Sequence, residues 1–241
     1  MTDSNQRQAR SFGTAAESYD RYRPTYAPEA IVWALGERPL RVADLGAGTG
    51  ILSRVLRGLG HEVVAVEPDD QMRTRLAAVS PDITALAGAA ERIPLPDRSV
   101  DAVVAGQAYH WFDVDRAHPE IARVLRPGGA FAVMRNEADP ATPWTVRFAE
   151  IIDGPGGDAR PAPDFGARFG PVEHAERRHE IRMTPDDLLA VATTRSPYLV
   201  ADEPRRRELL DAVRRLIAEA GLGDGPFAMP YVTQVYRATV E

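Results

Sequence analysis

The clearest chemical feature of the sequence is a glycine-rich turn that directly follows a short apolar run. Residues 41–45 form the apolar run, and Gly46, Gly48 and Gly50 come immediately after it. Because glycine has no side chain, such a turn allows the backbone to approach a nucleotide-like ligand closely. Asp44, near the end of the run, would repel a pyrophosphate but suits a cationic ammonium group.

The spacing of the glycines separates this turn from the dinucleotide-binding fingerprint. That fingerprint is G-x-G-x-x-G, and its third glycine allows a helix to pack closely on a strand. Ile51 stands where the third glycine would be. We therefore expect neither NAD nor FAD as the cofactor.

Two other reactive side chains follow apolar runs. Glu67 comes directly after residues 62–66, and a carboxylate there can accept hydrogen bonds from two hydroxyl groups. A helix-capping acid is the alternative interpretation of Glu67. His110 follows residues 100–105, at the edge where open α/β sheets bind ligands. A histidine, with an unperturbed pKa of about 6.5, can act as a general base, and a structural histidine is the alternative.

The elements that position these residues alternate between residues 40 and 135. Strand patterns lie at 41–45, 62–66, 83–86, 100–105 and 130–134, and helix patterns at 51–59, 69–79 and 115–125. This alternation predicts right-handed crossovers and a parallel sheet covered on both faces.

The flanking segments follow a different pattern. We expect helices at 11–22 and 27–35, broken at Arg23-Pro24, and helices at 144–152, after Thr184 and at 203–220. Short strands are expected at 179–183 and 231–240. The predicted organisation is one domain over 1–241, with a cover segment at 10–36, a cofactor-binding core at 40–137 and an irregular substrate-side insertion at 138–200.

The composition excludes several classes of protein. The 241 residues contain no cysteine, which rules out disulfides, thiol nucleophiles and Cys-ligated zinc. No apolar run approaches the roughly 20 residues that span a bilayer, and the polar N-terminal segment lacks the apolar core of a signal peptide. All 29 basic residues are arginine, but the net charge of −6 argues against a nucleic-acid partner. We expect a cytoplasmic monomer or homodimer with no membrane partner.

Four segments, in this order and spacing, resemble class I S-adenosylmethionine-dependent methyltransferases. They are Asp44-Leu-Gly-Ala-Gly-Thr-Gly50, Glu67, Ile93-Pro-Leu-Pro-Asp97 and Arg123-Val-Leu-Arg-Pro-Gly-Gly129. The resemblance covers residues 40–135. It implies a Rossmann-like fold with a mostly parallel seven-stranded sheet, helices on both faces and an antiparallel last strand. It also implies S-adenosyl-L-methionine as cofactor and S-adenosyl-L-homocysteine as product.

Three more segments are similar to a small-molecule subgroup that includes trans-aconitate methyltransferase. They are Phe12 with Tyr19-Asp-Arg-Tyr-Arg-Pro24, Gln107-Ala-Tyr-His-Trp-Phe112 and Arg195-Ser-Pro-Tyr198. Phe12, Tyr19 and Tyr22 give residues 11–26 apolar faces with little core of their own, so we expect this segment to be a mobile cover over the cofactor.

The resemblance also implies a set of site residues. The positions implied for the cofactor are Tyr19, Arg23, Asp44, Gly46, Ala47, Gly48, Glu67, Pro68, Met72, Ala89, Ala90, Glu91 and Gln107. The positions implied for the substrate are Tyr22, Tyr109, Trp111 and Arg195, with His110 as the catalytic candidate and no metal ligand. Ala89 departs from many relatives, which carry an acid there for the adenine amino group. The backbone of Ala90 and the side chain of Glu91 are the expected substitutes.

The function expected from these residues is methyl transfer to a small molecule, at a hydroxyl or carboxylate oxygen. A cofactor-binding protein without methyl transfer, such as a cyclase or a regulatory binder, is the main alternative. An RNA methyltransferase is disfavoured by the net charge. Gly106-Gln107-Ala108-Tyr109 also stands where amino-methylating nucleic-acid enzymes carry Asn/Asp-Pro-Pro-Tyr.

Overall fold

One sheet runs through the part of the chain that the computed structural model describes, residues 16–155 and 160–241. Within these residues it has seven strands in the order β3-β2-β1-β4-β5-β7-β6. The strands are β1 (Arg41–Leu45), β2 (Glu62–Glu67), β3 (Thr84–Ala87), β4 (Val100–Gly106), β5 (Leu125–Ala138), β6 (Glu173–Met183) and β7 (Phe227–Thr239). Strands β1 to β5 pair in parallel, whereas β7 is antiparallel to β5 and β6. The expected mostly parallel sheet with an antiparallel last strand is confirmed.

Helices cover both faces of the sheet. Three helices pack on one face: α3 (Pro28–Leu35), α4 (Ile51–Gly58) and α5 (Asp70–Val79). The other face is covered by α6 (Val114–Val124) and by Phe165 and Phe169. Val103 and Val104 of β4 belong to opposite clusters, because successive side chains of a strand point to opposite faces. This double cover explains why the strands of the parallel region are almost continuously apolar.

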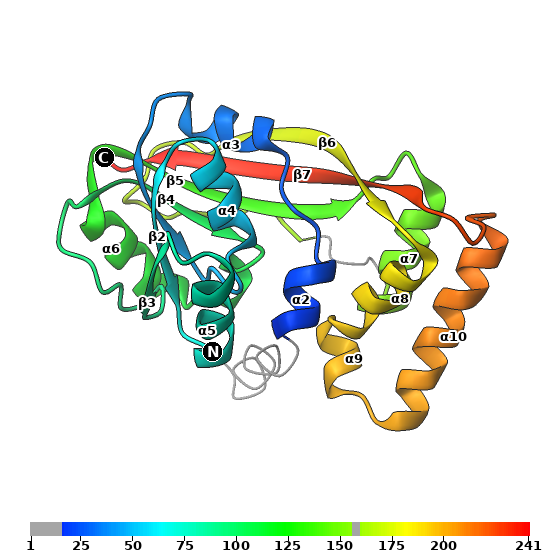
Figure 1. Cartoon of the computed structure of the whole chain (residues 1–241). Coiled ribbons are helices and arrows are strands. Elements are labelled where there is room, and N and C mark those ends of the chain that lie inside the picture. The colour runs from blue at the N-terminus through cyan, green and yellow to red at the C-terminus, as the bar shows by residue number, and fades with distance from the viewer. Residues whose placement is uncertain (1–15, 156–159) are drawn as a thin grey trace.

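Strands β5, β6 and β7 extend beyond the parallel region and carry a second group of helices, as Figure 1 shows. These helices are α7 (Pro143–Asp153), α8 (Pro185–Thr193), α9 (Ser196–Val200) and α10 (Glu203–Glu219). Phe148, Leu188, Val213 and Tyr231 from α7, α8, α10 and β7 belong to a separate buried cluster, which we call the helical cluster. The segment 138–200, expected to be irregular, is therefore largely built of regular elements.

The sequence patterns underestimated the lengths of three strands, of which β7 begins at Phe227 rather than at the predicted residue 231. The pattern predicted residues 130–134, but β5 spans Leu125–Ala138, and the predicted 179–183 is only the end of β6. The residues of β6 alternate between half-buried and exposed, and many of them are charged. Because β6 is an edge strand, backbone pairing to β7 holds it without an apolar pattern, and charges on such an edge discourage pairing with other chains.

Side-chain caps fix where several helices begin. The Asp69 carboxylate accepts hydrogen bonds from the backbone N–H groups of Gln71 and Met72 at the start of α5. Thr184 and Asp187 form a reciprocal capping box at α8, which confirms the cap predicted at Thr184.

Helix α2 (Ala16–Tyr22) lies between α5 and α8 in Figure 1. It therefore connects the parallel region of the sheet to the second group of helices. Asp20 accepts hydrogen bonds from Arg54 of α4 at 2.6 Å and from Arg75 of α5 at 3.3 Å. The predicted break at Arg23-Pro24 is confirmed, since α2 ends at Tyr22 and the next helix begins at Pro28. The part of the predicted first helix before residue 16, Phe12 included, lies outside the described residues. Among the helices that are described, none is long and apolar enough to cross a membrane.

Candidate functional site

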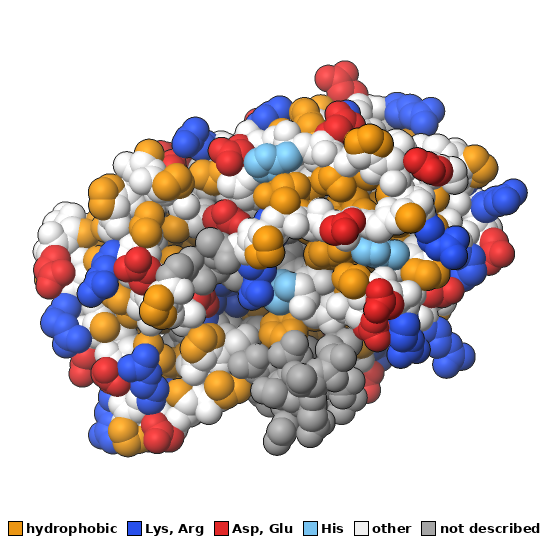
Figure 2. All heavy atoms as spheres, turned by 180° about the vertical axis from the view of Figure 1, so that it is seen from behind, with side chains coloured by type: hydrophobic (Ala, Val, Ile, Leu, Met, Phe, Trp, Pro, Cys, Tyr) orange, Lys and Arg blue, Asp and Glu red, His pale blue; other side chains and the backbone are white. Residues whose placement is uncertain are grey.

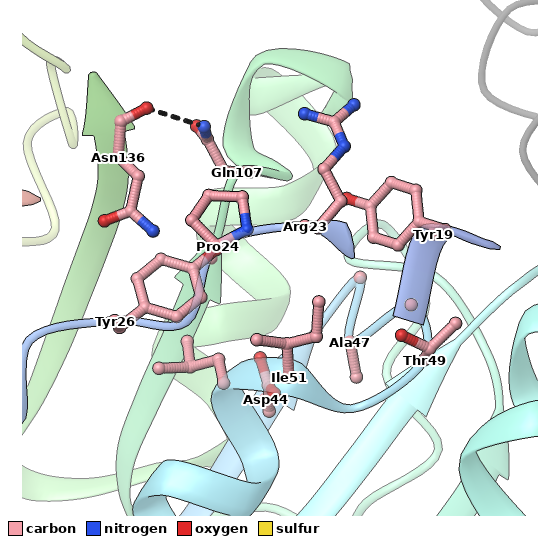
Figure 3. Close-up of a pocket in the computed structure, with 14 residues that line it drawn as sticks. Tyr19, Arg23, Pro24, Tyr26, Asp44, Ala47, Thr49, Ile51, Gln107 and Asn136 are labelled. Atoms are coloured by element: carbon pink, nitrogen blue, oxygen red, sulfur yellow. Dashed lines mark hydrogen bonds between the residues drawn. The ribbon is translucent and has the colours of Figure 1, made fainter. Parts of the chain in front are cut away.

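A pocket opens at the carboxyl ends of β1 and β4, and α2 and the residues after it form one of its walls (Figure 3). About 460 Å³ of empty space, part of it open solvent, lies among its lining residues. Its lining consists of Tyr19, Arg23, Pro24, Tyr26, Asp44, Gly46, Ala47, Gly48, Thr49, Ile51, Leu52, Gly106, Gln107 and Asn136. The structure therefore brings together seven of the thirteen residues expected to bind the cofactor.

The glycine-rich turn between β1 and α4 has a backbone that side chains would disturb. Gly46 has φ of 65°, and a Cβ atom placed there would lie 2.6 Å from the Cβ of Ala108. Gly48 has φ of 57°, and no atom lies within 4 Å of where its Cβ would be. Gly46 thus allows two turns to touch, while Gly48 leaves open space beside the pocket.

Asp44 places a buried carboxylate at the pocket. Its Oδ2 accepts a hydrogen bond of 2.5 Å from the Ser53 hydroxyl, whereas its Oδ1 has no partner among the described residues. The pKa of Asp44 is raised to about 7, mainly by burial and also by the nearby charge of Glu67, while hydrogen bonding to Ser53 opposes the shift. Thr49 also lines the pocket, and its buried hydroxyl finds no partner in the described part of the chain. Such unsatisfied groups in a pocket fit a polar ligand, and a cationic group beside Asp44 above all.

Glu67 lies at the end of β2 and binds the backbone of the glycine-rich turn. Its Oε2 accepts a hydrogen bond from the Gly48 N–H, and its Oε1 accepts one from the Asp69 N–H, each at 2.8 Å. Burial raises the pKa of Glu67, and these two backbone donors oppose that shift. Because each carboxylate oxygen has two lone pairs, both retain the capacity to accept a ligand hydroxyl. The ribose contact expected of Glu67 stays a prediction.

The residues expected around the adenine lie apart from the pocket lining. Glu91 Oε1 accepts a hydrogen bond of 2.7 Å from the Asp113 N–H, at the start of α6. Ala90 is buried in the cluster beneath α6, and Ala89 forms an isolated bridge with Arg92. Pro68 is exposed and Met72 is buried. Their contacts with a cofactor stay predictions, and Glu91 already has a structural partner.

Tyr109 begins the 3₁₀ helix η2 (Tyr109–Trp111) after β4, but its ring belongs to the core rather than to the pocket lining. Its hydroxyl donates to the Asp164 carbonyl at 2.8 Å and lies 3.0 Å from Nε2 of His118. Burial raises the pKa of Tyr109 to about 12. Tyr109 does not line the pocket, and its expected contact with the substrate stays a prediction. His110 and Trp111 are half-buried, their ring centroids lie 4.6 Å apart, and neither lines the pocket.

Two of the residues expected to bind the substrate, Tyr22 and Arg195, lie toward the helical cluster, and Arg23, expected to bind the cofactor, also reaches toward it. The guanidinium of Arg23 stacks over the Tyr19 ring at 4.8 Å, and its Nη2 donates to the Thr194 carbonyl at 3.2 Å. Arg195 is buried at the start of α9, 3.6 Å from Asp153, and Tyr22 packs on the helical cluster. Among the described residues, no group of three or more histidines and carboxylates is arranged to hold a metal ion.

The sequence did not predict several residues that line the pocket. Tyr26 and Asn136 illustrate the reasons. The Asn136 side chain donates to the Thr25 carbonyl at 2.7 Å, and its backbone carbonyl accepts from Gln107 at 3.0 Å (Figure 3). Asn136 lies near the carboxyl end of β5, so the rule that ligands bind at that edge would have found it if the strand had been predicted at its full length. Tyr26 follows a turn and has no pattern that points to a pocket.

Comparison with known proteins agrees with the fold. The profile of a family described as "Methyltransferase domain" matches residues 43–133. The chain is 42% identical to an uncharacterized methyltransferase of Mycobacterium tuberculosis over 242 residues, which cover 100% of both proteins. It is 37% identical over 133 residues to a malonyl-[acyl-carrier protein] O-methyltransferase of Methylococcus capsulatus, covering 51% of this chain and 48% of that protein.

Solved structures show the same architecture. A candidate type II methyltransferase from Anaeromyxobacter dehalogenans superposes with a TM-score of 0.65 at 26% identity, covering 90% of this chain and 98% of the other. The full-length match in sequence and the sheet order together decide the class. The chain belongs to the class I S-adenosylmethionine-dependent methyltransferases.

Proposed function

We propose that this protein transfers the methyl group of S-adenosylmethionine to an oxygen atom of a small molecule, a hydroxyl or a carboxylate. The observation that carries the proposal is the buried Asp44 carboxylate, which faces the pocket with one oxygen free of protein partners. A protonated amino group beside Asp44 would favour its ionised form and so offset the cost of its burial. When bound, the cofactor supplies a methyl group on a positively charged sulfur.

The residues of the glycine-rich turn and of α2 are proposed to hold the cofactor between them. Asp44 binds the amino group, and the backbone of Gly46, Ala47 and Gly48 lies along the methionine part. Tyr19, Arg23 and Gln107 close the same pocket from α2 and from the end of β4. Glu67 is proposed to accept the ribose hydroxyls, with Pro68, Met72 and residues 89–91 around the adenine. The pocket lining supports the methionine part of this division, and the remaining lone pairs of Glu67 support the ribose contact.

Methyl transfer depends largely on alignment, because the donor is already reactive. Holding the acceptor oxygen in line with the methyl group can lower the barrier by about 7–11 kcal/mol. A hydroxyl must also lose a proton, and His110, on the turn after β4, is the proposed base for such an acceptor. A carboxylate is ionised near neutral pH and needs no base.

The proposal of an oxygen acceptor rests on two likenesses. One is the resemblance to trans-aconitate-type enzymes in the segments around Tyr19, His110 and Arg195. The other is the match over half of this chain to a malonyl-[acyl-carrier protein] O-methyltransferase. Tyr22, Trp111 and Arg195 are proposed to lie on the acceptor side.

A small acceptor is proposed in preference to RNA because of the distribution and the sum of the charges. On the face drawn in Figure 2, acidic and basic side chains are interspersed. The net charge of −6 points the same way.

Turnover decides between a methyltransferase and a binding protein without transfer. We expect purified protein to convert S-adenosylmethionine to S-adenosylhomocysteine only when a panel of small carboxylic acids and alcohols includes an acceptor. Mass spectrometry of the acceptor then shows a gain of one methyl group on oxygen. Tight cofactor binding with a gain of the methyl group on nitrogen or carbon would contradict the oxygen assignment.

A further inference from the structure

The hydroxyl of Tyr231 is a buried polar group that the fold leaves unsatisfied. Tyr231 lies in β7, is 3% exposed and belongs to the helical cluster. Its ring stacks on His179 with centroids 5.8 Å apart. Its Oη has no hydrogen-bond partner among the described residues. Buried tyrosine hydroxyls ordinarily have a partner, so a missing one points to a ligand group.

The register of the sheet places Tyr231 next to the end of the cofactor pocket. In β7, Thr233 pairs with Asn136 of β5, and Tyr231 pairs with Ala138. The Thr233 hydroxyl donates to Asn136 Oδ1 at 2.6 Å, and Asn136 lines the pocket. Residues two apart in a strand point to the same face and lie about 7 Å from each other. Tyr231 therefore continues the surface that Thr233 and Asn136 begin, toward α7 and α9.

Positive charge predominates around this hydroxyl. Arg23 reaches from the pocket lining to the Thr194 carbonyl, and Thr194 directly precedes Arg195. Arg195 lies 3.6 Å from Asp153, and both side chains are largely buried. Burial raises the pKa of the Tyr231 phenol, while the charges of Arg195 and Arg23 lower it and Asp153 raises it. The hydroxyl thus lies near two cationic groups and one anionic group.

We propose that Tyr231 and Arg195 bind a carboxylate group of the methyl acceptor, at the end of the pocket that Arg23 lines. The proposal rests on the function proposed above and adds a recognition site for one class of acceptor. A phenol hydroxyl donates to one carboxylate oxygen while a guanidinium binds the other, and charge-assisted bonds of this kind are strong and directional.

The proposed route to this site runs past α2. The Tyr231 hydroxyl is enclosed in this structure, and Tyr22 at the end of α2 packs on the same helical cluster. The Arg23–Thr194 hydrogen bond links α2 to the segment that precedes α9. Displacement of α2 would break both contacts and open a route from the cofactor pocket toward Tyr231.

The test is a titration of the protein, saturated with S-adenosylhomocysteine, with monocarboxylates from acetate to hexanoate and with their primary amides. Calorimetry on the wild type is expected to show binding of at least one carboxylate and at least tenfold weaker binding of its amide. Tyr231→Phe is expected to weaken that carboxylate about tenfold or more, because a hydrogen bond to a charged group is lost. The melting temperature of Tyr231→Phe should stay the same or rise, since the substitution removes an unsatisfied hydroxyl.

Matched variants separate recognition from structure. Tyr236→Phe removes a hydroxyl from the same strand, one that Arg135 binds, and should leave carboxylate affinity unchanged. Arg195→Gln combined with Asp153→Asn removes both charges together, which avoids an unpaired buried carboxylate, and should abolish carboxylate binding.

Three results would overturn the proposal: no carboxylate binds the wild type, the amide binds as tightly, or Tyr231→Phe binds carboxylate as the wild type does. Failure of the wild type to bind S-adenosylhomocysteine would instead overturn the proposed function. The same carboxylate titrations on the ligand-free protein then decide on Tyr231 and Arg195 alone.

Discussion

Two buried carboxylates, Asp44 and Glu67, lie at the ends of neighbouring strands and differ in how the protein satisfies them. Both oxygens of Glu67 accept backbone N–H bonds, whereas Asp44 has the Ser53 hydroxyl on one oxygen only. Burial raises the pKa of both groups. Glu67 therefore fixes the turn while Asp44 keeps most of its capacity for a ligand.

Replacing Glu67 by Gln tests how far the turn depends on its carboxylate. The amide nitrogen of Gln cannot accept a hydrogen bond, so either the Gly48 or the Asp69 N–H loses its partner. A lost charge-assisted bond costs about 1.5–3 kcal/mol, so affinity for S-adenosylhomocysteine should fall about tenfold or more by calorimetry. Glu62→Gln at the exposed start of the same strand is the control. If Glu67→Gln binds S-adenosylhomocysteine as tightly as the control Glu62→Gln does, Glu67 has no part in the site.

His110→Gln distinguishes the two kinds of oxygen acceptor once an acceptor is known. With a hydroxyl acceptor, kcat should fall about 10²–10⁴-fold while affinity for the cofactor stays within a few-fold. With a carboxylate acceptor, KM should rise more than kcat falls, because no proton has to be removed. The exposed His174→Gln serves as control in the same steady-state assay. Wild-type values of both constants would leave His110 a structural histidine.

At the scale of elements, α2 connects the parallel region to the helical cluster across the pocket. Asp20 ties it to Arg54 and Arg75, and Arg23 ties its end to the Thr194 carbonyl. These polar contacts hold a helix of seven residues that buries little apolar surface of its own, with Ala16 as its buried residue. Such a segment opens at low cost, and a ligand beneath it favours the closed position.

Hydrogen exchange should detect the closing of this cover. We expect backbone amides of residues 16–26 to exchange more slowly when S-adenosylhomocysteine is bound, while those of α10, remote from the pocket lining, keep their rates. Asp20→Asn should speed exchange in α2 without ligand, since its bonds to Arg54 and Arg75 lose their charge. Unchanged exchange in residues 16–26 on ligand binding would contradict a covering role.

The elements show which parts of the fold were readable in the sequence. Strands β1, β2 and β4 are buried on both faces, so their apolar runs predicted them to within one residue. The cap at Thr184 was equally readable because its bonds are local. Strands β5 and β6 were predicted too short, since pairing with β7 holds their polar residues and pairing is not local. Asn136 of β5 was missed for the same reason, whereas Tyr26 follows a turn and has no pattern that points to a pocket.

At the scale of the whole molecule, the pocket draws its lining from segments far apart in sequence. Residues 19–26 belong to α2 and the segment after it, residues 44–52 to the glycine-rich turn and its flanks, and residues 106, 107 and 136 to the ends of β4 and β5. A ligand that contacts all of them binds only the folded chain. Binding must therefore appear as stability of the whole fold.

Thermal unfolding should show that S-adenosylhomocysteine stabilises the fold and that NAD and FAD do not. S-adenosylhomocysteine at 100 times its Kd should raise the free energy of unfolding by about 2.7 kcal/mol, with a clear rise in Tm. NAD and FAD at the same concentration should leave Tm unchanged, because the turn lacks the third glycine of the dinucleotide fingerprint. Equal stabilisation by NAD would contradict the assignment of the cofactor.

The central claim is that Asp44 binds the cofactor's amino group, and the affinity for S-adenosylhomocysteine at pH 8 and pH 6 tests it most directly. With a pKa raised to about 7, Asp44 becomes protonated as the pH falls through that value, so wild-type affinity should be lower at pH 6 than at pH 8. At pH 8, Asp44→Asn should bind S-adenosylhomocysteine at least about tenfold more weakly than the wild type. The affinity of Asp44→Asn should change little between pH 8 and pH 6. Asp82→Asn, an exposed carboxylate paired with Arg57, should behave as the wild type. Wild-type affinity in Asp44→Asn at pH 8 would contradict the claim.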